Sequence, residues 1–227
     1  MLLGLALFYV GAVLILNGLW MLGRIGDREI PVINLFAGGL SLLVALKLAF
    51  GEGADLASVK AAALSLLFSF TYLWVAINRY SGADGRGLGW FSLFVAITAV
   101  PVAADALHLA STPGEWWLGL SWVAWSVLWL MFFLMLALGR PLARPTACMA
   151  IGQGVLTGWL PGYLMLTGGT VAVPGAAFRC SWGFPLFYVG LAGNFPRPGL
   201  HTRPATAARS SAPRNPASAP GGRPLSL

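Results

Sequence analysis

Three tryptophans in the segment SWVAWSVLWL have the type and spacing that most strongly indicate chemistry. Trp122, Trp125 and Trp129 are three and four positions apart, so on a helix their indole rings share one stripe. A second apolar segment, FSFTYLW, places Phe68 and Tyr72 on one face, a helical turn apart. Such rings either pack as bulk against helices and lipid, or they form the walls of a narrow pore. Residue type and spacing alone leave both interpretations open.

The sequence lacks the usual catalytic and metal-binding patterns. It contains no H-E-x-x-H, no G-x-S-x-G, no glycine-rich phosphate loop and no cysteine pair at metal-ligand spacing. Its two cysteines, Cys148 and Cys180, are too few for a disulfide scaffold or a zinc site. We therefore expect a protein that is not an enzyme and that uses neither a metal nor a cofactor.

A few polar side chains lie within otherwise apolar segments. Asn17, Asn34 and Asn78 are predicted to form hydrogen bonds between helices, because unpaired polar groups are costly in lipid. Asp105 is the acidic residue that falls within a predicted membrane span. It is therefore the candidate for carrying a coupling proton, if transport is proton-coupled.

The elements that must position these residues are membrane-spanning helices. Of 227 residues, 58% are hydrophobic and 9% are charged, which predicts an all-α integral membrane bundle. The segment LFYVGAVLILNGL in the first predicted helix is weakly similar to SLFVAITAVPVAA in the fourth. This similarity raises the hypothesis that the bundle is an inverted repeat of three plus three helices. Six candidate spans make up a channel domain over residues 1–169: 2–22, 31–50, 58–79, 88–110, 116–138 and 147–168.

Arginine placement predicts the orientation of the bundle. Loops one, three and five each carry two arginines, whereas the second loop offers Lys60 and, at a helix end, Lys47, and the fourth loop offers no basic residue. Positively charged loops stay on the cytoplasmic side, so both termini are expected to face outside.

Two further groups of residues have predicted structural roles. Trp116 and Trp117 are expected to lie in the aromatic belt at the membrane surface. Close helix packing is expected at five glycines: Gly38, Gly39, Gly152, Gly154 and Gly158.

Residues 170–227 differ sharply in composition from the rest. This segment is rich in proline, alanine and serine and carries six arginines with no acidic residue. The composition predicts a disordered extension, for which translation out of the ancestral frame is one explanation. A basic arm that binds lipid or a partner is the alternative, and no role in nucleic-acid binding is expected.

Five stretches carry a resemblance to a known family: LFYVGAVLILNGLWMLGRIGDREIPVINLFAGGLSLLVAL, LLFSFTYLWVAIN, GLGWFSLFVAI, WVAWSVLWL and GVLTGWLPGYLMLTG. Together they resemble the AmiS/UreI family, bacterial inner-membrane channels for urea and short-chain amides, over residues 1–169. The amide-transporter branch is the nearer match, because the long outer loop of acid-gated urea channels is missing. The resemblance implies a homo-hexamer of six-helix protomers, each with its own pore, through which the solute moves passively.

The resemblance also implies a set of pore residues. Where the urea channels have a pore-facing glutamate, this chain has Gln153, which cannot titrate. The remaining members come from three segments of the chain: Leu3, Leu7, Val10, Leu14, Phe68, Tyr72, Trp122, Trp125, Leu128 and Trp129.

A slot of flat rings offers a way to pass a planar amide. Ring faces would stack on the solute, while indole N–H and phenol O–H groups would bond to its edge. We expect a channel that is open regardless of pH. The alternatives are a membrane scaffold without flux, a proton-coupled transporter and a membrane enzyme.

Overall fold

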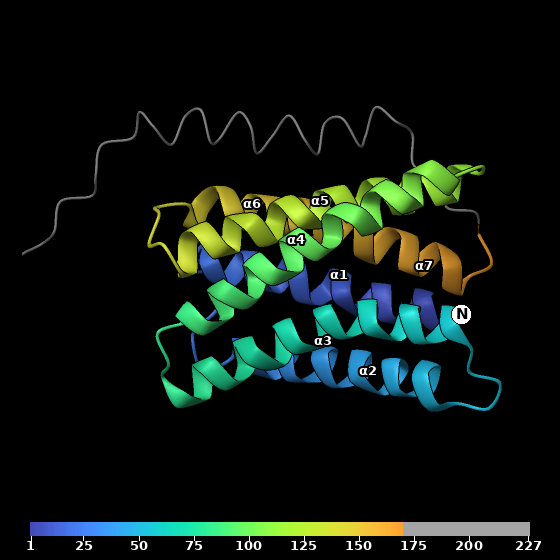
Figure 1. The fold of residues 1–227 in the computed structure, drawn as a ribbon. Helices are drawn as coiled ribbons and strands as arrows, with labels where there is room; N and C mark the ends of the chain where they lie inside the picture. Colours follow the sequence, from blue (N-terminus) through green and yellow to red (C-terminus); the bar gives the residue numbers. More distant parts are fainter. Residues whose placement is uncertain (170–227) are drawn as a thin grey trace, which may run out of the picture. The chain divides into compact units, whose positions relative to one another are not determined.

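The computed structural model describes residues 1–169, and every regular element within this range is helical (Figure 1). The predictions made above for residues 170–227 concern residues outside the described range. The elements in chain order are α1 (Leu2–Met21), α2 (Ile30–Phe50), α3 (Leu56–Ser81), α4 (Arg86–Leu109), α5 (Pro113–Leu136), α6 (Ala143–Gln153), η1 (Gly154–Trp159) and α7 (Leu160–Leu166).

Five of these helices, α1 to α5, are long and apolar enough to cross a membrane, which makes the chain a multi-pass membrane protein. The sixth predicted span corresponds to α6, η1 and α7, which follow one another without a gap from Ala143 to Leu166. The middle piece, η1, is π-helical and ends two residues before Pro161. Proline has no N–H to donate, so the regular helical hydrogen-bond pattern cannot continue through this position.

α3 and α5 are among the helices that begin earlier than hydropathy predicts, because their first turns are polar. Asp55 caps α3 by accepting a 2.8 Å hydrogen bond from the Ser58 N–H, and Ser58 bonds back to the Asp55 N–H. Thr112 and Glu115 form the same reciprocal box at the start of α5. A hydropathy search misses such turns, although the S/T/D-x-x-E/S pattern marks them.

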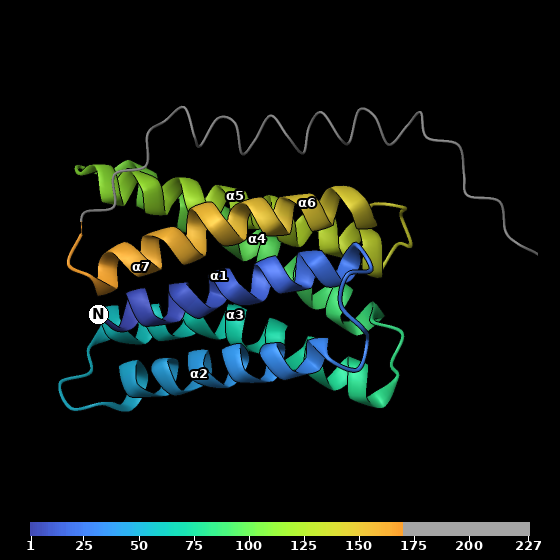
Figure 2. The same ribbon diagram turned by 180° about the vertical axis from the view of Figure 1, so that it is seen from behind.

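The helices pack as three main pairs (Figures 1 and 2). α2 pairs with α3, α4 pairs with α5, and α1 runs along α6, η1 and α7. Loops 22–29, 82–85 and 137–142 gather at one end, which we call the arginine end because the six arginines of residues 1–169 lie there. The other end, which we call the N-terminal end, carries Met1, the α2–α3 and α4–α5 loops and the end of α7.

A seam of glycines lets α1 approach the last helical segment at backbone contact. On α1 the seam consists of Gly4, Gly11 and Gly18, seven residues apart and therefore on one face. A Cβ at Gly11 would collide with the Trp159 backbone nitrogen and would lie 2.7 Å from the Gly154 carbonyl oxygen. A Cβ at Gly158 would lie 2.5 Å from the Gly11 Cα. The side chain of any other residue at these positions would push the two helices apart.

The glycine predictions made from sequence are partly confirmed. Gly154 and Gly158 belong to the seam, and Gly38 packs against Leu73. The predictions for Gly39 and Gly152 are wrong, because nothing lies within 4 Å of a Cβ added at either position. The sequence shows how many small residues a helix has, but not which of its faces meets another helix.

Asn17 and Asn34 join α1 to α2 as predicted, whereas the interhelical hydrogen bond predicted for Asn78 is not formed within residues 1–169. Asn17 and Asn34 exchange two side-chain hydrogen bonds, with donor–acceptor distances of 3.0 and 2.7 Å. Asn34 also donates to the Ile30 carbonyl at 3.0 Å and is fully buried. The two carboxamides thus satisfy each other in the membrane interior, where water is absent.

Replacing Gly11 by alanine tests the glycine seam. We expect Gly11→Ala to lower the free energy of unfolding by about 1–3 kcal/mol, because a methyl group there is overpacked against the Trp159 backbone. The measurement is reversible unfolding in bicelles or mixed micelles. Gly39→Ala is the matched control and should change stability by less than about 1 kcal/mol, in the stabilising direction. Equal effects of the two substitutions would contradict the seam.

Candidate functional site: two cavities and an aromatic barrier

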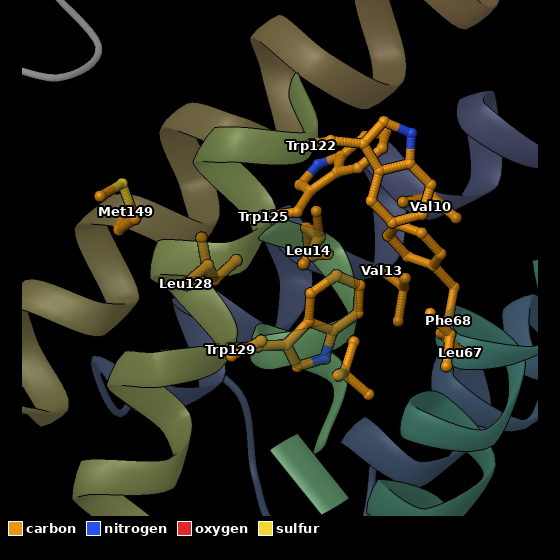
Figure 3. Packing of buried hydrophobic residues seen from close by; sticks show 14 of the residues in the cluster. Val10, Val13, Leu14, Leu67, Phe68, Trp122, Trp125, Leu128, Trp129 and Met149 are labelled. Carbon is orange, nitrogen blue, oxygen red and sulfur yellow. The ribbon is translucent and has the colours of Figure 1, made fainter. Parts of the chain in front are cut away.

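The interior of the bundle contains a group of four aromatic rings that we call the aromatic barrier. Figure 3 shows the rings at the centre of the buried cluster, contributed by α3 and α5. Phe68 is its hub, with its ring centroid 4.9 Å from that of Trp125 and 4.7 Å from that of Trp129, both edge to face. Trp122 completes the group at 5.9 Å from Phe68 and 5.1 Å from Trp125. Edge-to-face pairs of this kind contribute about 0.5–1.5 kcal/mol each beyond the area that they bury.

Two cavities lie on opposite sides of the barrier. The first, of about 240 Å³, follows α1, α3 and α5 from the barrier towards the arginine end, and we call it the arginine-side cavity. The second, of about 300 Å³, follows the same helices towards Met1, and we call it the N-terminal cavity. Phe68 and Trp125 line both cavities. The barrier is therefore the wall that separates two hollows along one path through the bundle.

Ten of the eleven residues predicted for the pore line these cavities. On the N-terminal side lie Leu3, Leu7, Val10 and Trp122, together with the two shared residues Phe68 and Trp125. The arginine-side cavity is lined by Leu14, Tyr72, Leu128 and Trp129, besides the same two shared residues.

Gln153 is the predicted residue that the structure does not bring to either cavity. Its side chain is fully buried, and Nε2 donates a 2.9 Å hydrogen bond to the Ala124 carbonyl of α5. Its Oε1 has no hydrogen-bond partner among residues 1–169. The amide thus joins the last helical segment to the back of α5, directly behind Trp125.

Two threonines hold the indoles of the barrier. Trp125 Nε1 donates to Thr157 Oγ1 at 2.9 Å, and Trp129 Nε1 donates to Thr71 Oγ1 at 3.2 Å. Each threonine hydroxyl donates its own proton to the carbonyl four residues earlier in its helix, at 2.7 Å. The expectation that these two indole N–H groups serve the solute is wrong, because both are already bonded within the protein.

Trp117 also departs from its prediction. It is 3% exposed, and its Nε1 donates to the Leu156 carbonyl at 3.2 Å, whereas Trp116 is half exposed. Only Trp116 therefore has the exposure that a surface belt requires. Neighbouring residues on a helix point about 100° apart, so the pair cannot share one environment.

Two polar groups of the predicted set remain available to a solute. Trp122 Nε1 and the Tyr72 hydroxyl have no hydrogen-bond partner among residues 1–169. Trp122 lines the N-terminal cavity and Tyr72 lines the arginine-side cavity. Each cavity therefore has an apolar wall with an aromatic hydrogen-bond donor.

Sequence reasoning did not assign to the pore the residues at the far end of the arginine-side cavity. Trp20, Asn78 and Arg79 line this end. The Arg79 guanidinium carbon lies 5.2 Å from the Trp20 ring centroid, and Trp20 Nε1 donates to Asp27 at 2.7 Å. Asn78 lies three residues after Val75, which itself lies three residues after Tyr72, so helical spacing was a signal that could have identified it.

At the N-terminal end, the titratable groups lie away from the cavities. The Ser58 backbone N–H and hydroxyl hold the pKa of the exposed Asp55 carboxyl below its ordinary value. Asp105 is exposed and lies 3.8 Å from Lys60, and His108 is exposed as well. Neither Asp105 nor His108 lines either cavity. No group of three potential metal ligands occurs within residues 1–169.

Comparisons with known proteins agree on one family. A profile of AmiS/UreI family transporters matches residues 2–169. A Mycolicibacterium smegmatis protein named for the transport of amidate substrates is 45% identical over 166 residues, covering 73% of this chain and 76% of that protein. The acid-activated urea channel of Helicobacter pylori is 40% identical, covering 72% of this chain and 96% of the channel.

Solved structures of the Helicobacter pylori urea channel have a similar fold. The cryoEM structure of its closed state has a TM-score of 0.67 at 38% identity and covers 73% of this chain and 97% of that one. The crystal structure has a TM-score of 0.66 at 39% identity and covers 75% of this chain and all of that one.

Removing the Thr157 hydroxyl tests how the barrier is held. Thr157→Val keeps the shape of the side chain but leaves the buried Trp125 N–H without an acceptor, so we expect a loss of about 1 kcal/mol in unfolding free energy. Thr157→Ser retains the acceptor and should lose clearly less. The measurement is the same unfolding titration, and a serine variant as unstable as the valine variant would count against the hydrogen bond.

Proposed function

The chain belongs to the AmiS/UreI family of transporters, and from this premise we propose that it is a passive membrane channel for urea and short-chain aliphatic amides. The observation that carries the proposal is the pair of apolar cavities on either side of the aromatic barrier. Relatives named as a urea channel and as a transporter of amidate substrates support the same solutes.

The chemistry of the path suits small uncharged amides. Taking an amide out of water without replacing its hydrogen bonds costs several kcal/mol, about 2–7 depending on the reference state. In this path Trp122 and Tyr72 offer donors on either side of the barrier. An ion would lose far more hydration than such groups return, so cations and anions are excluded. Few and weak contacts also let the solute leave again.

Passage requires the barrier to open. Its rings contact one another edge to face, and Thr71 and Thr157 fix two of the indoles. Phe68 has no polar atom and no hydrogen bond to hold it. We assign the moving part to the Phe68 ring, whose displacement would join the two cavities, while the indoles act as fixed walls.

The remaining features of the proposal concern membrane topology and assembly. α6, η1 and α7 together form a sixth crossing, the arginine end faces the cytoplasm and the protein resides in the bacterial inner membrane. Six arginines at one end, against two lysines at the other, support this orientation. The homo-hexamer rests on the family resemblance. An inverted repeat is not part of the proposal, because the extensive α2–α3 contact has a much smaller counterpart between α5 and α6.

The alternatives have less support. Proton coupling would need an acid on the path, and Asp105, with two thirds of its side-chain surface exposed, lies beside Lys60 outside both cavities. Family members are channels and transporters, which argues against an enzyme. A scaffold without flux would not need two cavities in line.

Osmotic swelling of vesicles tests the function. Proteoliposomes that contain the full chain should swell faster than empty vesicles in urea and in acetamide, because both solutes are planar and uncharged. Glycerol, which is bulkier and not planar, should enter at nearly the rate of empty vesicles. The measurement is stopped-flow light scattering. Urea and acetamide rates equal to those of empty vesicles would refute the channel.

Flux should not depend on pH between 7 and 5. Because the pKa of Asp55 is lowered, its cap on α3 is fully present above the ordinary aspartate pKa and is lost only as pH falls through the lowered one. His108 is exposed and lines neither cavity. The measurement is acetamide swelling at both pH values, with vesicles equilibrated on both sides. A steep rise at pH 5 would show acid activation.

A further inference from the structure

The carboxamide of Asn78, in the arginine-side cavity, has no hydrogen-bond partner among residues 1–169. Asn78 is 5% exposed and lines this cavity, yet neither its Nδ2 nor its Oδ1 forms a hydrogen bond with any of residues 1–169. The fully buried side-chain atoms without a partner in residues 1–169 are Thr146 Oγ1 and Gln153 Oε1, so the polar atoms of Asn78 are accessible from the cavity. A carboxamide there offers two N–H donors and a carbonyl acceptor to whatever occupies the cavity. The other buried asparagines, Asn17 and Asn34, bond to each other.

The place of Asn78 on α3 puts this group on the solute path. Four residues of α3 line the arginine-side cavity and follow one another three or four positions apart: Phe68, Tyr72, Val75 and Asn78. With a rise of 1.5 Å per residue, Asn78 lies about 9 Å beyond Tyr72 and about 15 Å beyond Phe68. A small amide that has passed the barrier would therefore meet the Tyr72 hydroxyl first and the Asn78 carboxamide second.

The end of the cavity near Asn78 is structurally defined. Arg79, the next residue, is oriented by the Trp20 ring and by Asp27, to which its Nη1 lies at 3.9 Å. Gly85, in a left-handed conformation with φ of 84°, lies beside Asn78, where an added Cβ would be 4.0 Å from the Asn78 Nδ2. Asn78 thus lies where α3 ends and the cavity approaches the arginine end.

We propose that Asn78 is a binding position for the carboxamide group of the solute, which pairs with it through two reciprocal hydrogen bonds. The Asn17–Asn34 pair shows this arrangement between two side chains of the same interior, with distances of 3.0 and 2.7 Å. Acetamide carries the same functional group as an asparagine side chain, and urea presents the same edge. The inference rests on the proposed function and adds to it a site that selects the solute.

The pairing defines which solutes the site accepts. It requires a carbonyl oxygen and an N–H on the same edge of the molecule, as in urea and primary amides. In N-methylacetamide the trans amide places its N–H on the side opposite the oxygen, so it can form one of the two bonds but not both. We therefore expect Asn78 to favour acetamide over N-methylacetamide.

Two substitutions at Asn78 test the site. Asn78→Leu removes every polar atom, and Asn78→Asp keeps the shape but removes the donors. Both should lower the ratio of acetamide to N-methylacetamide flux by about fivefold, the effect of losing roughly one net hydrogen bond. Stopped-flow swelling of proteoliposomes measures both rates. Ser121→Ala is the control, because Ser121 is buried, lines neither cavity and bonds within its own helix to the Trp117 carbonyl. It should leave the ratio unchanged.

The outcomes separate this site from the proposed function. An unchanged ratio in both Asn78 variants, with wild-type flux above that of empty vesicles, would overturn the site and leave the channel in place. Wild-type flux no higher than that of empty vesicles would instead overturn the channel. A direct measurement uses the unaltered full chain with ¹⁵N-labelled asparagine in bilayers. Added acetamide should shift the side-chain signal of Asn78 but not those of Asn17 and Asn34, and an unshifted Asn78 signal would overturn the site.

Discussion

Backbone contact between α1 and the last helical segment determines where η1 lies, and η1 carries the hydroxyl that holds the indole of Trp125. Gly11 meets Gly158 and the Trp159 backbone, so η1 lies closer to α1 than any side chain would allow. This approach turns Thr157 of η1 towards α5, where its hydroxyl accepts the Trp125 N–H at 2.9 Å. The barrier between the two cavities therefore depends on a contact that involves no side chain. In lipid, where the hydrophobic effect does not drive helices together, such close packing is a principal source of stability.

Some polar side chains inside the bundle have hydrogen-bond partners within the protein, and others that line a cavity have none among residues 1–169. The indoles of Trp125 and Trp129 donate to threonines whose own protons are bound to helix carbonyls. These rings consequently present apolar walls with fixed orientation. Tyr72 and Asn78 are equally buried but have no partner within residues 1–169. Unlike the unpaired Gln153 Oε1, the Tyr72 and Asn78 groups belong to residues that line a cavity, which is where we propose that a solute replaces water.

The apolar path also explains why charge is kept at the two ends. Charged side chains within residues 1–169 lie at the loops and helix termini, and the Arg79–Asp27 and Lys60–Asp105 pairs are at least partly exposed. A neutral solute passes between these ends without crossing a charged group on the path. Within residues 1–169, the cavity walls carry no titratable side chain other than Tyr72 and Arg79, and this is the physical reason why we expect flux not to respond to mild acid.

Hydropathy, aromatic spacing and family resemblance were sufficient to predict an all-helical membrane bundle and to name ten residues that line its cavities. These features are local, because the period of an α-helix places Trp122, Trp125 and Trp129 on one stripe whatever surrounds it. Pairing between distant residues is not local. Tertiary structure alone decided that Thr157 and Thr71 take up two indole protons, that Gln153 faces α5, that Trp117 is buried and that Asn78 is left unpaired. Each outcome depends on the distance between two helices and on the rotation of each helix about its axis. Neither quantity can be obtained from the sequence of one helix.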